Sequence, residues 1–257
     1  MAKTSFKNLL KLNRTILGTF LQIPAPEMAE IVGYAGFDCA IIDTEHGMMG
    51  TDASIAMVRG CDAADLTCIY RVPGVDAHRI GQALDFGASA VMVPNIKNQQ
   101  DAARVVCAAK YHPLGDRGVC PFTRGARYNA VDEDPTYYER ANTETAVLLQ
   151  IEAAEGIASL DQILEVPNID CVFIGPFDLS QSLGIPGKVT DDRVLGAIKD
   201  IVRRAKARGV AVGNFPVTIE QAHLYMELGV QFLAYGDDTL ITQRAYRDLR
   251  RAILKHS

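Results

Sequence analysis

The sequence predicts a single (β/α)8 barrel, a TIM barrel, spanning residues 1–257. Apolar runs of four to six residues recur along the chain, and each is followed by a turn and then by a segment with apolar residues three and four apart. This alternation is typical of βα units around a parallel sheet, and eight such units fit a chain of about 250 residues. Because no change of composition divides the chain, one barrel is favoured over a doubly wound sheet.

The strands follow one another at regular intervals. They are expected at residues 15–20, 38–42, 67–71, 90–93, 146–151, 171–174, 210–213 and 232–235. The segments between them carry helical spacing, as in the apolar positions of residues 198–205. Three of these helices are expected to end at a glycine that tolerates the left-handed conformation of a C-terminal cap: Gly87, Gly209 and Gly229.

Residues 111–143 are the one irregular stretch, rich in Gly, Pro, Arg and Tyr and much longer than an ordinary connection. Loops of this length usually carry function or mediate contacts between subunits. Arg124 and Arg127 within it could act in the active site of a neighbouring subunit or serve only at a subunit interface, and both readings stay open.

Composition excludes several classes of function. The chain has 26 basic and 31 acidic residues, for a net charge of −5, and no basic run that could follow a nucleic-acid backbone. No stretch approaches the 18 apolar residues of a membrane span, and the N-terminus does not resemble a signal peptide. The six cysteines form no CxxC pair, which is typical of buried thiols in a reducing compartment. We therefore expect a cytoplasmic enzyme with small-molecule substrates.

Polar side chains collect where the expected strands end. They are Asp43, Glu45 and His46 after the second strand, Arg71 on the third, Gln150 and Glu152 on the fifth, and Asp178 after the sixth. The carboxyl ends of barrel strands meet at one mouth, so these groups should converge there.

Glu152 and Asp178 are the expected metal ligands. Two carboxylates without a nearby thiolate suit a hard divalent cation that keeps open positions for substrate. Such a cation polarises a carbonyl oxygen and stabilises an enolate. Taken singly, Glu152 could instead be a first-turn helix acid and Asp178 an N-cap.

Arg71, His46 and Asp43 are the expected catalytic residues. The Arg71 guanidinium can stabilise a developing negative charge or grip a carboxylate, although it could also simply pair with a barrel acid. His46, oriented by Asp43, can accept a proton near neutral pH, although a solvated loop is the alternative for this segment.

The stretch "GPFDLS" at residues 175–180 is expected to bind the substrate carboxylate. The backbone amides of Gly175, Phe177 and Asp178 lie at a turn that opens a helix beginning with "DLSQSLG", where free N–H groups favour an anion. A 2-oxo acid would fit such a site.

The segments "GFDCAIIDTEHG", "LLQIEAAEGIASLDQIL" and "DCVFIGPFDLSQSLGIPG" resemble the metal-dependent, class II pyruvate aldolases of the HpcH/HpaI type, over about residue 16 to the C-terminus. The resemblance implies Mg²⁺, Mn²⁺ or Co²⁺ on Glu152 and Asp178, and it places Arg71 at the enolate. It further implies that Gln150 and Glu45 hold water around the cation. A last helix exchanged between subunits is also implied, as is a hexamer built as a trimer of dimers.

The activity implied is that of a lyase that cleaves a 4-hydroxy-2-oxo acid to pyruvate and an aldehyde, and runs in reverse. Phe177 and Phe215 stand where family members often carry smaller or aliphatic residues beside the aldehyde, so the aldehyde stays open. A Schiff-base aldolase is disfavoured because Lys97 is the one lysine near a strand end. Two alternatives remain: a synthase that condenses the enolate with an acyl or keto-acid partner, as citrate-forming members do, and a barrel that only binds metabolites.

Overall fold

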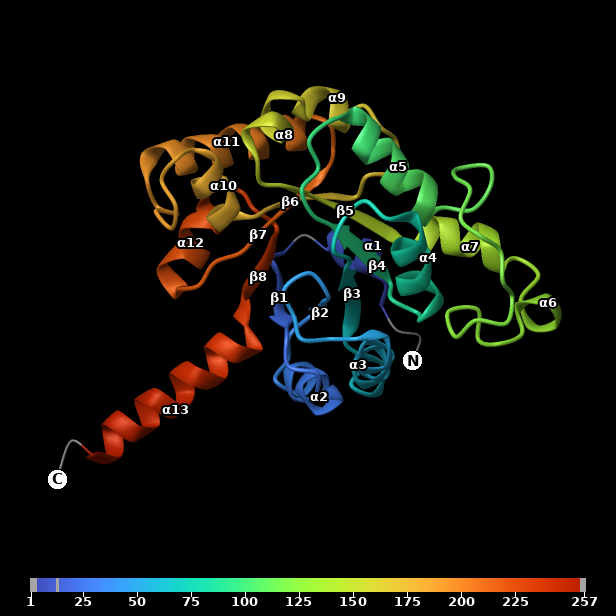
Figure 1. Ribbon diagram of the computed structural model, residues 1–257, viewed down its shortest axis with the longest axis horizontal. Coiled ribbons are helices and arrows are strands. Elements are labelled where there is room, and N and C mark those ends of the chain that lie inside the picture. Colours follow the sequence, from blue (N-terminus) through green and yellow to red (C-terminus); the bar gives the residue numbers. More distant parts are fainter. Residues whose placement is uncertain (1–3, 13, 255–257) are drawn as a thin grey trace.

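The computed structural model describes residues 4–12 and 14–254, and its eight parallel strands close into a barrel in sequence order (Figure 1). The strands are β1 (Ile16–Leu21), β2 (Cys39–Asp43), β3 (Thr67–Arg71), β4 (Ala90–Val93), β5 (Ala146–Ile151), β6 (Cys171–Ile174), β7 (Ala211–Asn214) and β8 (Phe232–Asp237). All eight expected strands are confirmed. The largest difference is in β8, which continues two residues past its expected end and shifts register against β1.

Helices surround the strands as expected for this fold. They are α1 (Phe6–Leu10), α2 (Pro26–Tyr34), α3 (Thr51–Ala63), α4 (Ala77–Asp85), α5 (Gln99–Ala109), α6 (Ala130–Glu133), α7 (Tyr137–Glu144), α8 (Ala154–Ala158), α9 (Leu160–Leu164), α10 (Pro176–Ser182), α11 (Asp192–Ala207), α12 (Ile219–Glu227) and α13 (Asp238–Leu254). The predicted glycine caps are confirmed, since Gly87, Gly209 and Gly229 follow α4, α11 and α12 with φ of +97°, +70° and +92°. Within the described residues, no helix is long and apolar enough to span a membrane.

The barrel interior is filled by aromatic rings that meet glycines. Phe6 of α1 packs edge-on against Phe232, with ring centroids 5.1 Å apart, and so closes the N-terminal end. A Cβ on Gly18 or Gly213 would lie 3.0 Å or 2.8 Å from the Phe232 ring, and the Gly213 Cβ also 2.7 Å from Phe173. The glycines therefore make room for the large rings, which leave no open channel below the mouth.

Alternation along the strands determines which polar residues reach the mouth. In β2, Cys39 and Ile41 face the barrel interior while Ala40 and Ile42 pack against the outer helices. Asp43, two positions after the inward-facing Ile41, therefore also faces inward, at the C-terminal end of β2. The same parity applies in β3, where Ile69 faces inward and Arg71 follows two positions later.

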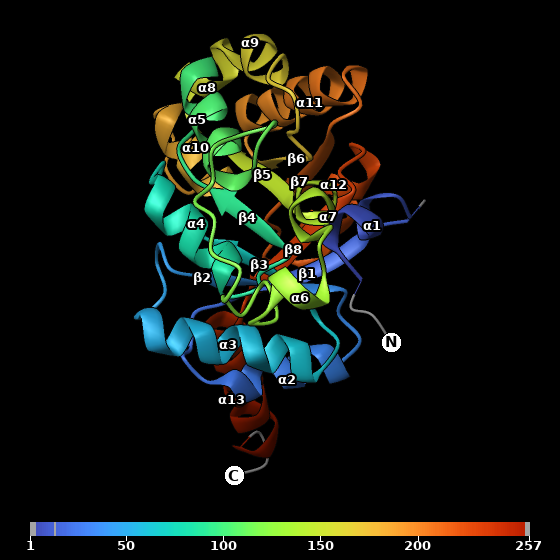
Figure 2. The same ribbon diagram turned by 90° about the vertical axis from the view of Figure 1, so that its right-hand side faces the viewer.

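Residues 111–143 lie at the N-terminal end of the barrel, opposite to the mouth. Arg124 binds Asp62 and the carbonyl of Phe86, two residues that precede β3 and β4. Helix α7 lies beside α1 (Figure 2). This segment therefore takes no part in the mouth of the same subunit.

Helix α13 projects away from the barrel (Figure 1). Its apolar residues Tyr246, Leu249 and Ile253 are exposed, whereas Asp238 at its start is buried. Leu17, on the outer face of β1, is also exposed. A final helix packed onto the barrel would cover that face.

Candidate active site

Asp43 and Arg71 form a buried ion pair at the centre of the mouth. They are direct neighbours in the register of β2 and β3. Arg71 donates from Nε to Asp43 Oδ1 at 2.9 Å and from Nη2 to Oδ2 at 2.7 Å. The guanidinium also lies 4.6 Å from the centroid of the Phe20 ring. Pairing with a barrel acid, one of the two roles considered for Arg71, is thus realised, and it fixes the plane of the guanidinium.

The Asp43 carboxylate is saturated with donors. Beyond Arg71, Oδ2 accepts from the Gln22 side chain at 3.0 Å, and Oδ1 accepts from the backbone amides of Glu45 and His46 at 3.1 and 3.2 Å. Burial alone would raise the pKa of Asp43, but the hydrogen bonds and charge of Arg71, aided by Gln22, outweigh it and hold the pKa below its ordinary value.

The expected orientation of the His46 ring by Asp43 is not present. Asp43 binds the backbone of His46 and its carboxylate is already occupied, so it positions the loop and not the imidazole. The ring is 62% exposed, and Nε2 lies 4.0 Å from Glu45 Oε1. The register that pairs Asp43 with Arg71 is the reason, since a bidentate arginine leaves the carboxylate no room for a ring.

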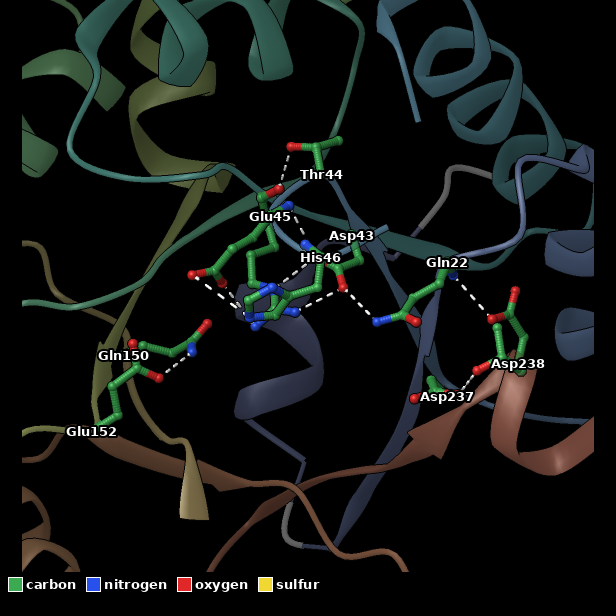
Figure 3. Close-up of polar contacts among 11 residues, drawn as sticks. Gln22, Asp43, Thr44, Glu45, His46, Gln150, Glu152, Asp237 and Asp238 are labelled. Carbon is green, nitrogen blue, oxygen red and sulfur yellow. Dashed lines mark hydrogen bonds and ion pairs between the residues drawn. The ribbon is translucent and has the colours of Figure 1, made fainter. Parts of the chain in front are cut away.

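Glu45 links this pair to the other carboxylates. Its Oε2 lies 3.0 Å from Arg71 Nη1. Burial raises the pKa of Glu45 despite the opposing charge of Arg71, and the nearby charge of Glu152 raises it further. In Figure 3, Glu45 and His46 lie between Glu152 and Gln150 on one side and Gln22 and Asp237 on the other.

Glu152 is held rigidly just past the end of β5. Its Oε1 accepts from the backbone amide of Asn95 at 2.8 Å, and its Oε2 accepts from the Gln150 side chain at 2.7 Å. Asn95 adopts a left-handed conformation with φ of +58°, which the sequence did not indicate. A Cβ on Gly175 would lie 2.5 Å from Glu152 Oε2, so a larger residue at this position would displace the Glu152 carboxylate.

Asp178 lies in the first turn of α10, close to Glu152. The helix begins at Pro176, two residues earlier than expected, so Asp178 is not its cap. Leu179 is the first residue whose amide bonds within the helix, to the Gly175 carbonyl at 2.9 Å. Pro176 has no N–H, and the amides of Phe177 and Asp178 therefore remain available at the helix start.

Burial raises the pKa of Glu152, and the charge of Asp178 raises it further. The two carboxylates that the sequence singled out are therefore close enough to interact. Among the described residues, no group of three or more His, Cys, Asp or Glu side chains could hold a metal ion.

A cavity of about 240 Å³ opens at this end of the barrel. The predicted residues that line it are His46, Arg71, Gln150, Gly175, Phe177, Asp178 and Phe215. The sequence did not single out Phe20, Gln22 and Asp237, which also line it. Two signals could have identified them: Phe20 and Gln22 share the inward parity of β1, and Asp237 ends β8.

Other candidate groups lie elsewhere. Lys97 is exposed, and Lys110 is fully buried at the N-terminal end, where its Nζ donates to the carbonyls of Asn142 and Thr145 at 2.9 and 2.6 Å. Arg127 is exposed on the same long segment as Arg124. A larger hollow of about 600 Å³ around Lys7 contains none of the predicted residues. The smaller cavity is therefore lined by most of the predicted site residues, although Asp43, Glu45 and Glu152 are not among its lining residues.

Comparison with known proteins gives a consistent result. A model of the HpcH/HpaI aldolase/citrate lyase family matches residues 16–245. The chain is 38% identical over 246 residues to the hydroxypyruvate/pyruvate aldolase of Deinococcus radiodurans, covering 95% of this chain and 88% of that protein. It is 35% identical over 243 residues to the 4-hydroxy-2-oxo-heptane-1,7-dioate aldolase of Salmonella dublin, covering 94% and 91%.

Two solved structures have the same fold. An HpcH/HpaI aldolase/citrate lyase family protein from Burkholderia cenocepacia superposes with a TM-score of 0.90 at 30% identity, over 96% of this chain and 97% of that chain. The citrate synthase SbnG superposes with a TM-score of 0.85 at 31% identity, over 97% and 96%. Similarity therefore extends over the whole barrel.

Proposed function

Because the chain belongs to the HpcH/HpaI aldolase/citrate lyase family, we propose that it is a divalent-cation-dependent aldolase that cleaves a 4-hydroxy-2-oxo acid to pyruvate and an aldehyde. The reaction is a reversible carbon–carbon lyase reaction. The observation that carries the proposal is that Asp178 and the fixed guanidinium of Arg71 line one cavity, while Glu152 lies beside it, next to Asp178 and bound to the lining residue Gln150.

The residues at Glu152 fit a cation. Glu152 is buried beside the exposed Asp178, so two carboxylates are neighbours there, while Arg71 is already engaged by Asp43 and Glu45. The buried Oε1 of Gln150 has no hydrogen-bond partner among the described residues, which is unusual for a native structure and suits a site completed by bound groups. Glu152 and Asp178 would hold Mg²⁺, Mn²⁺ or Co²⁺, which when bound would polarise the 2-oxo group and stabilise an enolate.

The protein residues divide the remaining work. In cleavage, the proton on the C4 hydroxyl passes to His46, whose exposed ring lines the cavity. The C3–C4 bond then breaks, the aldehyde leaves, and C3 takes up a proton to give pyruvate. Arg71 donates to the oxygen on which negative charge develops, and the free amides of Phe177 and Asp178 bind the substrate carboxylate.

Asp43 acts as a positioning residue in this proposal. It aligns Arg71 through two charge-assisted hydrogen bonds and anchors the backbone of the loop that carries His46. Gln22, which directly follows β1, supports it, and the backbone of Gln22 is in turn held by the buried Asp238 carboxylate at 3.0 Å (Figure 3). Glu45 and Gln150 would order water around a bound cation.

We also propose a cytoplasmic homo-oligomer, a hexamer assembled as a trimer of dimers. The exposed apolar residues of α13 and the exposed Leu17 on β1 support exchange of α13 with a neighbouring subunit. The exposed side chains of Phe122 and Tyr128 support a subunit contact for the long segment that carries Arg124 and Arg127. Buried thiols such as Cys39 and Cys171 support a reducing compartment.

The proposal is tested with protein stripped of metal by a chelator. Pyruvate release from 4-hydroxy-2-oxo acids should be absent, and it should return when Mg²⁺, Mn²⁺ or Co²⁺ is added. Borohydride treatment with pyruvate should not inactivate the enzyme, since no lysine lines the cavity within the described chain. Activity that survives the chelator and is lost on borohydride treatment would reverse the assignment. Similarity to a citrate synthase makes a condensing synthase the second candidate, favoured by turnover of oxaloacetate with an acyl thioester and none of any hydroxy-keto acid.

A further inference from the structure

One wall of the cavity is formed by Phe20, Phe177, Phe215 and Asp237, and it differs in character from the part lined by Gln150, Gly175 and Asp178. From the chemistry of that wall, we infer that the enzyme selects uncharged aldehydes and discriminates against aldehydes that carry a carboxylate, with Asp237 as the residue that sets this preference. The inference rests on the proposed aldolase function and names the substrate class of the same site.

Three aromatic rings make up most of this wall. Phe20 and Phe215 pack edge to face with centroids 5.3 Å apart, and Phe215 packs in the same way on Phe177 at 6.1 Å. Phe20 is buried and is fixed on its other side by Phe173 at 5.9 Å. The rings come from β1 and from the segments after β6 and β7, so they form a continuous apolar surface that offers no hydrogen-bond donor.

Asp237 sets the charge of this wall. It ends β8 and lines the cavity. Its Oδ1 accepts from the Thr239 hydroxyl at 2.5 Å and from the Leu240 amide at 2.7 Å, so the carboxylate is fixed in orientation. Within the described chain, Oδ2 accepts no hydrogen bond and is left for a ligand. Figure 3 places Asp237 beside Gln22, on the side away from Glu152 and Gln150.

Apart from His46, which the proposed reaction already uses, no cationic side chain among the described residues is available in the cavity to receive an additional carboxylate. Arg71 is the single arginine or lysine among the described residues that line the cavity, and Asp43 and Glu45 already bind it. A second carboxylate on the aldehyde would therefore meet three aromatic rings and the like charge of Asp237. Juxtaposed like charges and an unpaired, desolvated carboxylate both act against binding.

An uncharged aldehyde meets a complementary surface instead. An alkyl chain packs on the rings, and a hydroxyl group can donate to the open Oδ2 of Asp237. The name of the Salmonella dublin relative, a heptane-1,7-dioate aldolase, specifies a substrate with a second carboxylate. The inference therefore separates the substrate of this enzyme from that of a relative that is 35% identical in sequence.

The experiment compares two aldehydes of matched length that differ in charge: 4-oxobutanoate and its methyl ester. Each is condensed with pyruvate by the wild-type enzyme in the presence of Mn²⁺, and kcat/KM is measured. We expect the ester to be preferred by at least about tenfold. Asp237→Asn should reduce that ratio about tenfold, chiefly by raising kcat/KM for 4-oxobutanoate.

Asp161→Asn is the matched control, because it removes one negative charge from an acid whose side chain is 64% exposed and lies outside the cavity. The ratio of kcat/KM for the ester to kcat/KM for 4-oxobutanoate should be the same in Asp161→Asn as in the wild type. The inference is overturned if the wild type uses 4-oxobutanoate as well as the ester. It is overturned equally if Asp237→Asn, shown to fold by its thermal midpoint, leaves the ratio unchanged.

A separate measurement distinguishes this outcome from failure of the proposed function. Exchange of the pyruvate methyl protons in D2O with Mn²⁺, followed by NMR without any aldehyde, reports enolate formation alone. If the methyl protons exchange but the enzyme does not prefer the ester to 4-oxobutanoate, the proposed selectivity is refuted and the proposed aldolase function is retained. Absence of both exchange and condensation refutes the aldolase, and the inference falls with it.

Discussion

Asp43→Asn should destabilise the protein because it removes one partner of a buried ion pair. Asp43 is fully buried, and the Arg71 side chain is only 10% exposed, so the arginine would keep its charge with Glu45 as its remaining acid. Removing one member of such a pair costs about 3 kcal/mol of unfolding free energy. An unfolding entropy of about 2 cal/mol/K per residue gives about 0.5 kcal/mol/K for the chain, so the thermal midpoint should fall by about 6 °C.

The matched control is Asp38→Asn. Asp38 binds Arg14 through two hydrogen bonds of 2.8 and 2.6 Å, but Arg14 is 51% exposed. An exposed pair contributes about 1 kcal/mol or less. Calorimetry or urea unfolding at neutral pH measures both variants, and equal losses in the two would refute the role given to burial at Asp43.

The pH dependence provides a second check on the same pair. The folded-state pKa of Asp43 lies below its ordinary value, so its ionised form contributes stability above the unfolded-state pKa. That contribution is lost as the pH falls through the folded-state pKa. Wild type and Asp43→Asn should therefore converge in stability at acid pH, and a constant difference would contradict the account.

Three further perturbations follow from the same geometry. Arg71→Lys keeps the charge but loses the planar fork, so kcat/KM for aldol cleavage should fall about 100-fold, and a loss below threefold would remove Arg71 from the mechanism. Gly175→Ala places a methyl 2.5 Å from Glu152 Oε2 and should weaken Mn²⁺ binding at least about tenfold, whereas Gly196→Ala meets nothing within 4 Å and should leave Mn²⁺ affinity unchanged. Burial, with a smaller contribution from Lys7, lowers the pKa of Lys110 from 10.5 to about 8, so the unfolded state binds more protons between these values. In urea unfolding, the free energy of unfolding of the wild type should therefore increase by about 3 kcal/mol relative to that of Lys110→Met as the pH rises from 8 to 10.5. A difference between the two proteins that does not change with pH would show that Lys110 is not desolvated.

Much of the site could be predicted because strands impose alternation. Once β2 and β3 are located, the parity that buries Ile41 and Ile69 in the barrel interior also points Asp43 and Arg71 inward. Parallel strands then bring their carboxyl ends to one mouth. Neither inference requires a distance between residues from a structure. The hydrophobic pattern and the turn signals were therefore sufficient to predict that Asp43 and Arg71 lie at the mouth.

The partners of these residues could not be predicted in the same way. The choice of Asp43 between Arg71 and the His46 ring depends on register, which hydrophobic pattern leaves undetermined. The amide that holds Glu152 comes from Asn95 in a left-handed conformation, set by tertiary contacts. Asp237 was missed because β8 continues past its apolar run, at a place where its register against β1 shifts.

Mn²⁺ binding followed by electron paramagnetic resonance tests the central claim most directly. Glu152 and Asp178 are proposed to share one cation, so wild-type enzyme should bind one Mn²⁺ per chain with a spectrum that changes when pyruvate is added. Glu152→Gln and Asp178→Asn should each abolish this site while the fold, checked by circular dichroism, is retained. Mn²⁺ bound with unchanged affinity and spectrum in both variants would contradict the account.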